Sequence, residues 1–168
     1  MTPSLEKLRV LVVDDNPQMR TIVGAVLGAV GIRHIFFAGD GVAGLTAVHS
    51  RDVDVVYVDY EMPLMNGLDF ISAVRAMAGD VRFLPIIMLT GYADRAHLNA
   101  ARDRGVTEFL AKPVTARSIL TRLAAVIDHP RAFVSCASYF GPDRRRRKQA
   151  ADGSPRRRST DAPDVISL

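Results

Sequence analysis

A single pattern recurs along the first three quarters of the chain: a short apolar run followed by a segment with helical spacing of apolar residues. The first apolar run, at residues 8–13, is almost entirely aliphatic and β-branched, as expected for a strand buried on both faces of a parallel sheet. Asn16 can then cap a helix, Pro17 suits its first turn, and apolar residues continue at helical spacing until Gly31. The unit is therefore a strand, an acidic loop and a helix.

The same unit is repeated four more times. Apolar runs suited to strands occur near residues 35–37, 53–58, 84–89 and 107–111. The helices that follow are expected to start at Asp40, to lie around Phe70 to Met77, to start at Asp94, and to run from Thr115 to about Ile127. Alternating strands and helices require right-handed crossovers, which place helices on both faces of the sheet. The sequence predicts an α/β fold, a doubly wound five-stranded parallel sheet.

The pattern stops after Asp128, and the charge changes there too. Residues 1–128 hold 13 Lys and Arg against 14 Asp and Glu, whereas residues 129–168 hold 9 against 4. We therefore predict one folded domain over 1–128 and a basic, largely disordered C-terminal tail over 129–168, too polar to build a core. Phe133, Tyr139 and Phe140 are the tail residues that could dock on the body. No apolar run is long enough to cross a membrane and no signal-like stretch opens the chain, so we expect a cytoplasmic protein without membrane insertion.

Polar residues follow four of the predicted strands. Asp14 and Asp15 follow the first, Asp59 the third, Thr90 the fourth and Lys112 the fifth. Parallel sheets gather the carboxyl ends of their strands at one edge, where sites are usually found. We expect these five side chains to meet there.

Their chemistry suits phosphoryl transfer. Three converging carboxylates repel one another unless a cation lies among them, and hard oxygen ligands in an open site favour Mg²⁺. A carboxylate such as Asp59 can act as the nucleophile and form an acyl phosphate. Lys112 and Thr90 can bind phosphoryl oxygens, so the set supplies positioning and charge stabilisation.

The stretches VLVVDDN, VDYEMPLMNG, MLTGYAD and EFLAKP resemble the response-regulator receiver family of CheY-like proteins over about residues 8–128. The resemblance implies a flavodoxin-like strand order of 2-1-3-4-5 and Asp59 as the phosphoacceptor. It implies a Mg²⁺ site formed by Asp14, Asp15, Asp59 and the backbone carbonyl of Glu61. It also implies a cis bond after Lys112, which turns that side chain into the site.

The resemblance further implies a two-component phosphorelay role as a signalling protein, not a turnover enzyme, with self-catalysed phosphotransfer and dephosphorylation. The phosphodonor is expected to be a histidine kinase or a histidine phosphotransfer protein. Phe109 stands where the family commonly has an aromatic that turns inward when the hydroxyl of a residue like Thr90 moves toward phosphate. An output protein, such as a flagellar motor switch, would then bind the face of helix four, strand five and helix five. The acidic Glu61, two residues after the acceptor, is a departure that alters access or phosphoryl lifetime in a direction the sequence leaves open.

Other functions fit the sequence less well. A P-loop needs G-x-x-x-x-G-K-[ST], and a dinucleotide site needs glycines directly after the first strand, where this chain has acids. A haloacid-dehalogenase-like aspartyl-phosphate phosphatase uses a D-x-D pattern after strand one, whereas Asp14 and Asp15 are adjacent. Phosphorylation at Asp14 rather than Asp59 would favour that alternative. We do not expect DNA binding by a separate output domain, because about 40 residues are too few for an independent core.

The tail carries its own motif. The segment SYFGPDRRRR, followed by PRRR, resembles the arginine-rich tails of CheY-like proteins that bind cyclic di-GMP. Arginines clamp phosphates and stack on purines, and an aromatic ring adds a stacking surface. The expected contacts are Tyr139, Arg144, Arg145, Arg146 and Arg147. The alternatives are a merely solvated charged tail and nonspecific binding of nucleic acid or another anionic surface.

Overall fold

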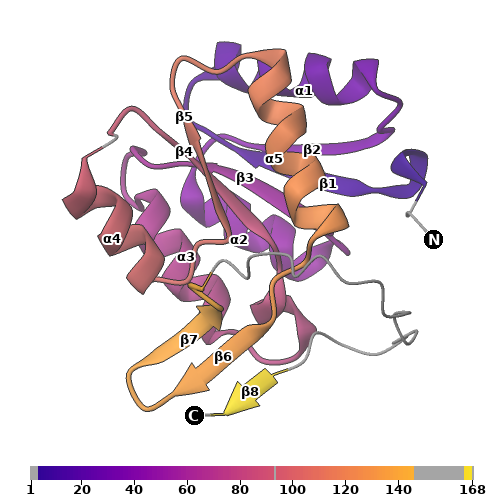
Figure 1. The fold of residues 1–168 in the computed structure, drawn as a ribbon. Coiled ribbons are helices and arrows are strands. Elements are labelled where there is room, and N and C mark those ends of the chain that lie inside the picture. Colours follow the sequence, from indigo (N-terminus) through magenta and orange to yellow (C-terminus); the bar gives the residue numbers. More distant parts are fainter. Residues whose placement is uncertain (1–3, 93, 146–164, 168) are drawn as a thin grey trace.

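The protein folds around a five-stranded parallel sheet whose order is β2-β1-β3-β4-β5 (Figure 1). The computed structural model describes residues 4–92, 94–145 and 165–167. The strands of this sheet are β1 (Arg9–Val13), β2 (His34–Ala38), β3 (Val55–Asp59), β4 (Ile86–Thr90) and β5 (Glu108–Ala111). The predicted fold class and strand order are confirmed.

Four helices connect these strands and a fifth follows β5, and each helix starts after a side chain that caps it. They are α1 (Pro17–Ala29), α2 (Gly41–Ser50), α3 (Gly67–Ala76), α4 (Arg95–Asp103) and α5 (Ala116–Asp128). The caps expected from the sequence accept hydrogen bonds from backbone N–H groups of the first turn, and they are Asn16, Asp40, Asp94 and Thr115. The sequence pattern missed the cap of α3, Asn66, which accepts from the N–H of Asp69.

The two faces of the sheet have separate cores. One contains apolar side chains of α1 and α5, among them Leu27 and Ile119, and the other contains side chains of α2 and α3, among them Val48 and Phe70. Every residue of β3 and β4 is buried. Because helices cover both faces, these strands are continuous apolar runs without polar alternation.

A β-hairpin follows α5. Strand β6 (Phe133–Cys136) pairs antiparallel with β7 (Tyr139–Pro142), and β8 (Val165–Ser167) pairs with β6 in parallel (Figure 1). The expected largely disordered tail over 129–168 thus needs correction at residues 133–142.

Aromatic contacts explain why the hairpin is ordered. Phe83, in the 3-10 turn η2 (Asp80–Phe83) before β4, packs edge-on against Phe133 at 5.2 Å and Phe140 at 5.5 Å between ring centroids. Phe133 is only 3% exposed, and the guanidinium of Arg82 lies 3.7 Å from the Phe140 ring centroid. Burial of these rings offsets the ordering entropy of the short segment. Phe133 and Phe140 thus dock on the body, as the sequence allowed.

Arg75 of α3 packs against the hairpin from the body of the protein. It is 5% exposed and donates hydrogen bonds to the backbone carbonyls of Gly105, Arg82 and Leu84 at 3.0, 2.9 and 2.8 Å. Its guanidinium also lies 5.0 Å from the Phe133 ring centroid. Burial lowers the pKa of Arg75 to about 9, which leaves the group charged at neutral pH. This one side chain therefore joins α3, the loops before β4 and β5, and the hairpin.

Gly105 permits the close approach of the hairpin. Its φ is +91°, and a Cβ there would lie 3.0 Å from the carbonyl oxygen of Phe140. Any other residue would meet both a left-handed backbone and a crowded neighbour.

Among the described residues, none of the helices has the length and apolarity that spanning a membrane requires.

Candidate functional site

The sheet brings the three predicted acids together. Asp14 and Asp15 follow β1, and Asp59 ends β3, the neighbouring strand. One carboxylate oxygen from each lies within 4.8 Å of the others. The parallel register causes this convergence, because Val13 pairs with Val58 and the next residues of both strands leave the same edge.

Asp14 is the most constrained of the three. It is 1% exposed, its Oδ1 accepts a hydrogen bond from the Asn16 N–H at 2.8 Å, and its Oδ2 is buried with no hydrogen-bond partner among the described residues. Burial raises the pKa of Asp14, and the charge of Asp59 raises it further. A buried carboxylate oxygen without a donor, next to two more carboxylates, fits a hard divalent cation such as Mg²⁺.

Asp59 has a cationic partner. Its Oδ1 lies 2.7 Å from Nζ of Lys112, and its side chain is 5% exposed against 31% for the lysine. Burial raises the pKa of the Asp59 carboxyl, and the hydrogen bond and charge of Lys112 oppose that rise. The Lys112–Pro113 bond is cis, as the family resemblance implied. Asp59 is thus a buried carboxylate paired with a partly exposed lysine.

Thr90 lies at the same edge of the sheet. Thr90 pairs with Ala111, the residue before Lys112, while Asp59 pairs with Leu89, the residue before Thr90. The Thr90 hydroxyl accepts from the Tyr92 N–H at 3.0 Å and donates to the Tyr92 carbonyl at 3.2 Å. In this state the hydroxyl is held by its own loop.

Tyr92 is the residue of this site that sequence reasoning missed. Its hydroxyl donates to Oε1 of Glu61, and its ring stacks on His97 of α4 with centroids 4.5 Å apart. The signal lay in the MLTGYAD stretch, two residues after Thr90. Tyr92 links the loop after β3, the Thr90 loop and α4. The role expected for the Glu61 backbone carbonyl stays a prediction.

The remaining predicted residues lie away from the acids. Phe109, on β5, is half-buried against the core, and the Arg102 guanidinium lies 5.9 Å from its ring centroid. At the hairpin, the Arg144 guanidinium lies 4.1 Å from the Tyr139 ring centroid. Arg145 is exposed, while Arg146 and Arg147 fall outside the described residues.

Comparison with known families agrees with this geometry. Residues 10–124 match the response regulator receiver domain family, and the chain belongs to that family.

Individual relatives are bacterial chemotaxis proteins. The chain is 32% identical to chemotaxis protein CheY-3 of Vibrio cholerae over 123 residues, covering 73% of this chain and 94% of that protein. It is 32% identical to CheY of Pseudomonas aeruginosa over 121 residues, covering 72% and 97%. These alignments cover most of each relative and leave over a quarter of this chain unmatched.

Solved structures show the same fold. Vibrio cholerae CheY4 superposes with a TM-score of 0.67 at 32% identity, covering 71% of this chain and 98% of that chain. The receiver domain of a Pseudomonas aeruginosa sensor histidine kinase, solved with a magnesium ion coordinated in its active site cleft, superposes with a TM-score of 0.66 at 26% identity, covering 72% and 98%. This chain is therefore a CheY-like receiver domain of two-component signalling.

Proposed function

We propose that Asp59 accepts a phosphoryl group in the cytoplasm from a histidine kinase or a histidine phosphotransfer protein. The observation that carries the proposal is the ion pair of Asp59 with Lys112 beside Asp14 and Asp15. A carboxylate oxygen of Asp59 forms the O–P bond as the P–N bond of the phosphohistidine breaks, and the freed imidazole takes up a proton. The product is an acyl phosphate.

Lys112 and Thr90 stabilise the transferring group. The ammonium of Lys112, already 2.7 Å from Asp59, binds a phosphoryl oxygen as charge develops there. The Thr90 hydroxyl leaves its hydrogen bonds with Tyr92 and donates to a second oxygen. These two groups make the chain the catalyst of its own phosphorylation and dephosphorylation, while the signal leaves through partner binding.

Mg²⁺ is the cofactor that the acid cluster fits. Asp14, Asp15, Asp59 and the Glu61 carbonyl would hold it, since Asp14 has a buried oxygen without a donor. When bound, Mg²⁺ neutralises charge on the carboxylates and on the phosphoryl oxygens. The protein side chains orient the phosphoryl group.

Movement of Thr90 would be transmitted to Phe109. Phe109 is half-buried on β5 and packs against the core of the α2 and α3 face. Phosphorylation then shifts an existing equilibrium between inactive and active conformations of the face formed by α4, β5 and α5. This face binds the output protein, for example a flagellar motor switch. The same loop movement would disturb the stacking of Tyr92 on His97 of α4.

The tail is proposed to bind cyclic di-GMP. The supporting observation is the Arg144 guanidinium stacked over Tyr139, which offers a flat cationic surface to a purine and hydrogen-bond donors to a phosphate. Arg145, Arg146 and Arg147 would add further contacts.

Incubation with Mg²⁺ and acetyl phosphate, followed by intact mass measurement, tests the acceptor. The wild type should gain one phosphoryl group and Asp59→Asn should gain none, with Asp52→Asn, at a side chain that is 87% exposed and outside the acid site, as the matched acid control. An undiminished adduct on Asp59→Asn would refute the assignment, and loss of the adduct only in Asp14→Asn would favour the phosphatase alternative.

Calorimetry tests the tail. Cyclic di-GMP should bind the full chain with a defined stoichiometry, and removal of residues 131–168 should abolish it. Equal binding of a single-stranded oligonucleotide, falling steeply with salt, would instead indicate nonspecific binding by counterion release.

A further inference from the structure

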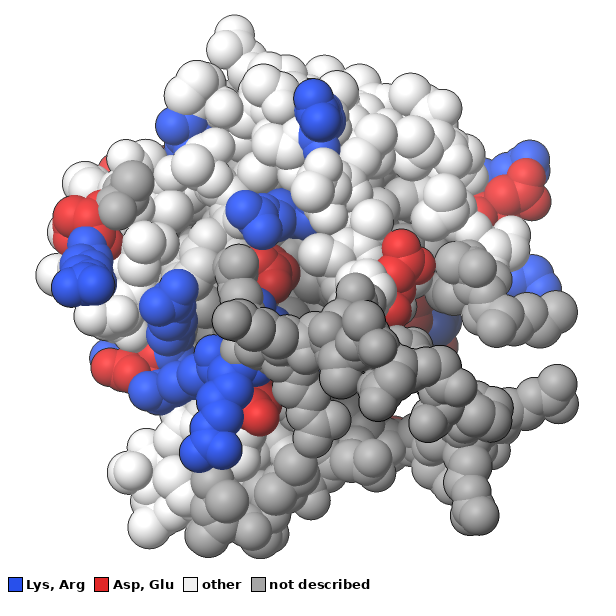
Figure 2. All heavy atoms as spheres, in the orientation of Figure 1, with Lys and Arg blue, Asp and Glu red and all other residues white. Residues whose placement is uncertain are grey.

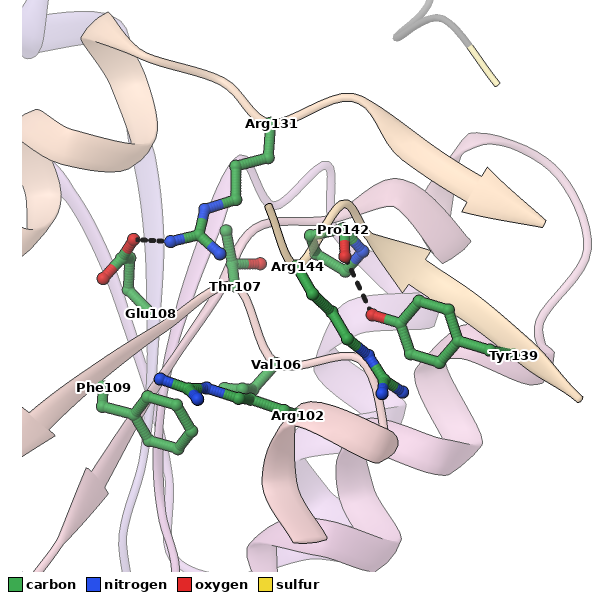
Figure 3. A pocket seen from close by; sticks show the side chains of 9 residues that line it. All are labelled: Arg102, Val106, Thr107, Glu108, Phe109, Arg131, Tyr139, Pro142 and Arg144. Carbon is green, nitrogen blue, oxygen red and sulfur yellow. Dashed lines mark hydrogen bonds and ion pairs between the residues drawn. The ribbon is translucent and has the colours of Figure 1, made fainter. Parts of the chain in front are cut away.

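A pocket of about 160 Å³ lies where the receiver body meets the hairpin (Figure 3). Its walls come from the end of α4, the start of β5, the segment after α5 and the end of β7. Arg102 of α4, Arg131 after α5 and Arg144 after β7 all line it. Figure 3 shows Arg131 extending toward Glu108, Arg102 toward Phe109 and Arg144 toward Tyr139. The pocket is at the opposite end of β5 from Lys112, so it is separate from the acid site.

The pocket carries an excess of positive charge. Its single acid, Glu108, is already paired with Arg131 at 2.7 Å and with Arg122 at 3.2 Å. Arg144 pairs with Asp103 at 3.0 Å in an exposed bridge, and Arg102 has no ion pair within the described part of the chain. Figure 2 shows basic side chains gathered over the region where α4 and the hairpin meet.

We infer that this pocket binds one phosphate group of a larger phosphate ester. Pockets that enclose whole small-molecule ligands measure roughly 300–1,000 Å³, so a hollow of about 160 Å³ fits only part of such a ligand. Guanidinium groups match phosphate oxygens with paired hydrogen bonds. The rest of the ligand would extend over Tyr139, whose hydroxyl is fixed by a 2.9 Å bond to the Pro142 carbonyl.

The position of Arg102 and Arg131 extends the proposed tail function. Both lie in segments that flank the pocket, α4 and the segment after α5, so a phosphate there would be held between the body and Arg144 after the hairpin. A ligand bound only by the tail would not depend on Arg102.

Phe109, the residue of the proposed switch, also lines the pocket. The Arg102 guanidinium lies 5.9 Å from the centroid of its ring. If Phe109 turns inward on phosphorylation, which rests on the proposed function, Arg102 loses the ring and becomes free to bind phosphate. Phosphorylation at Asp59 then tightens phosphate binding, and by linkage the bound ester stabilises the phosphorylated conformation.

Calorimetry of the full chain with GMP tests the site. Arg102→Ala should weaken GMP binding by about tenfold or more, because a charged hydrogen bond is lost. Arg33→Ala removes the same charge from a side chain that is 71% exposed and paired with Glu6, and it should change the affinity by less than about twofold. Matching thermal unfolding curves for the two variants will show that both are folded.

Beryllofluoride with Mg²⁺, which occupies a carboxylate as a phosphoryl mimic, tests the coupling. It should tighten GMP binding several-fold in the wild type, and the change should vanish in Phe109→Ala.

Two outcomes would overturn the phosphate site: no GMP binding, or equal weakening in Arg102→Ala and Arg33→Ala. No response to beryllofluoride in a protein that acetyl phosphate does phosphorylate would overturn the coupling. Cyclic di-GMP binding that is unchanged in Arg102→Ala would leave the tail proposal standing and eliminate the pocket. GMP binding that depends on Arg102 without any phosphorylation of Asp59 would leave the pocket standing and eliminate the switch.

Discussion

Asp14→Asn should stabilise the metal-free protein, although most substitutions of buried residues destabilise. Asp14 is 1% exposed and its carboxylate lies within 4.8 Å of those of Asp15 and Asp59. Two unit charges 4.8 Å apart repel by about 3.5 kcal/mol at an effective dielectric constant of about 20. Asp15 is exposed and its charge is screened by solvent, so the Asp14–Asp59 pair dominates.

The asparagine keeps the hydrogen bond from the Asn16 N–H and removes the negative charge of Asp14. Its Oδ1 can still accept the 2.8 Å hydrogen bond from the Asn16 N–H, while its amide N–H can donate toward a neighbouring carboxylate. After solvent relaxation we expect a gain of about 1–3 kcal/mol in the free energy of unfolding. Urea unfolding in EDTA at pH 7 measures it.

Mg²⁺ and pH should each change the stability of the wild type more than that of Asp14→Asn. A bound ligand stabilises by about 2.7 kcal/mol at 100 times its Kd, so Mg²⁺ should stabilise the wild type and should stabilise Asp14→Asn less. Because the native state raises the pKa of Asp14, it binds protons more tightly than the unfolded chain. Stability of the metal-free wild type should therefore rise as the pH falls from 7 toward that raised pKa, with a smaller slope in the variant.

One result would refute this reasoning. If Asp14→Asn unfolds at lower urea concentration than the wild type in EDTA, the acids do not destabilise one another and the case for a cation among them loses its physical basis.

Three further predictions concern the scaffold. Arg75→Ala should lower the free energy of unfolding by about 3–5 kcal/mol, since it leaves three carbonyls without their charged donor; a loss below about 1 kcal/mol in urea unfolding would contradict this. Gly67→Ala should lower both the thermal midpoint and the initial rate of phosphorylation by acetyl phosphate, because its Cβ would lie 2.5 Å from the Asp59 carbonyl oxygen; an unchanged rate would show that the acceptor strand does not shift. Phe133→Ala should release the hairpin and open residues 129–145 to limited proteolysis while the sheet stays protected, and resistance equal to the wild type would show that the ring does not anchor it.

Much of the fold was predictable because it depends on local patterns. Apolar runs without polar alternation identify strands covered on both faces, and Asn16, Asp40, Asp94 and Thr115 mark helix starts by chemistry that needs no tertiary partner. The hairpin was not predictable in the same way. Its order comes from contacts of Phe133 and Phe140 with Phe83, some 50 residues earlier. The sequence shows that these aromatic residues could dock on the body, but not which residues they would contact.

In the candidate site, too, the sequence predicts which residues take part, whereas only the fold fixes their contacts. Residue types and their places after the strands identify Asp14, Asp15, Asp59, Thr90 and Lys112, because parallel strands deliver their carboxyl ends to one edge whatever the details of packing. The state of each group depends on distances between segments remote in sequence, such as the 2.7 Å contact from Lys112 to Asp59 and the donor-free oxygen of Asp14.

The sequence by itself determined which chemical groups are present and which strand carries each of them, since periodicity and capping act within a few residues. Only the tertiary structure decided that Arg102, Arg131 and Arg144 share a pocket with Phe109, and that Arg75 is buried beneath the hairpin. The physical reason is that burial, ion pairing and pKa shifts are set by what surrounds a group in space, and those neighbours come from distant parts of the chain.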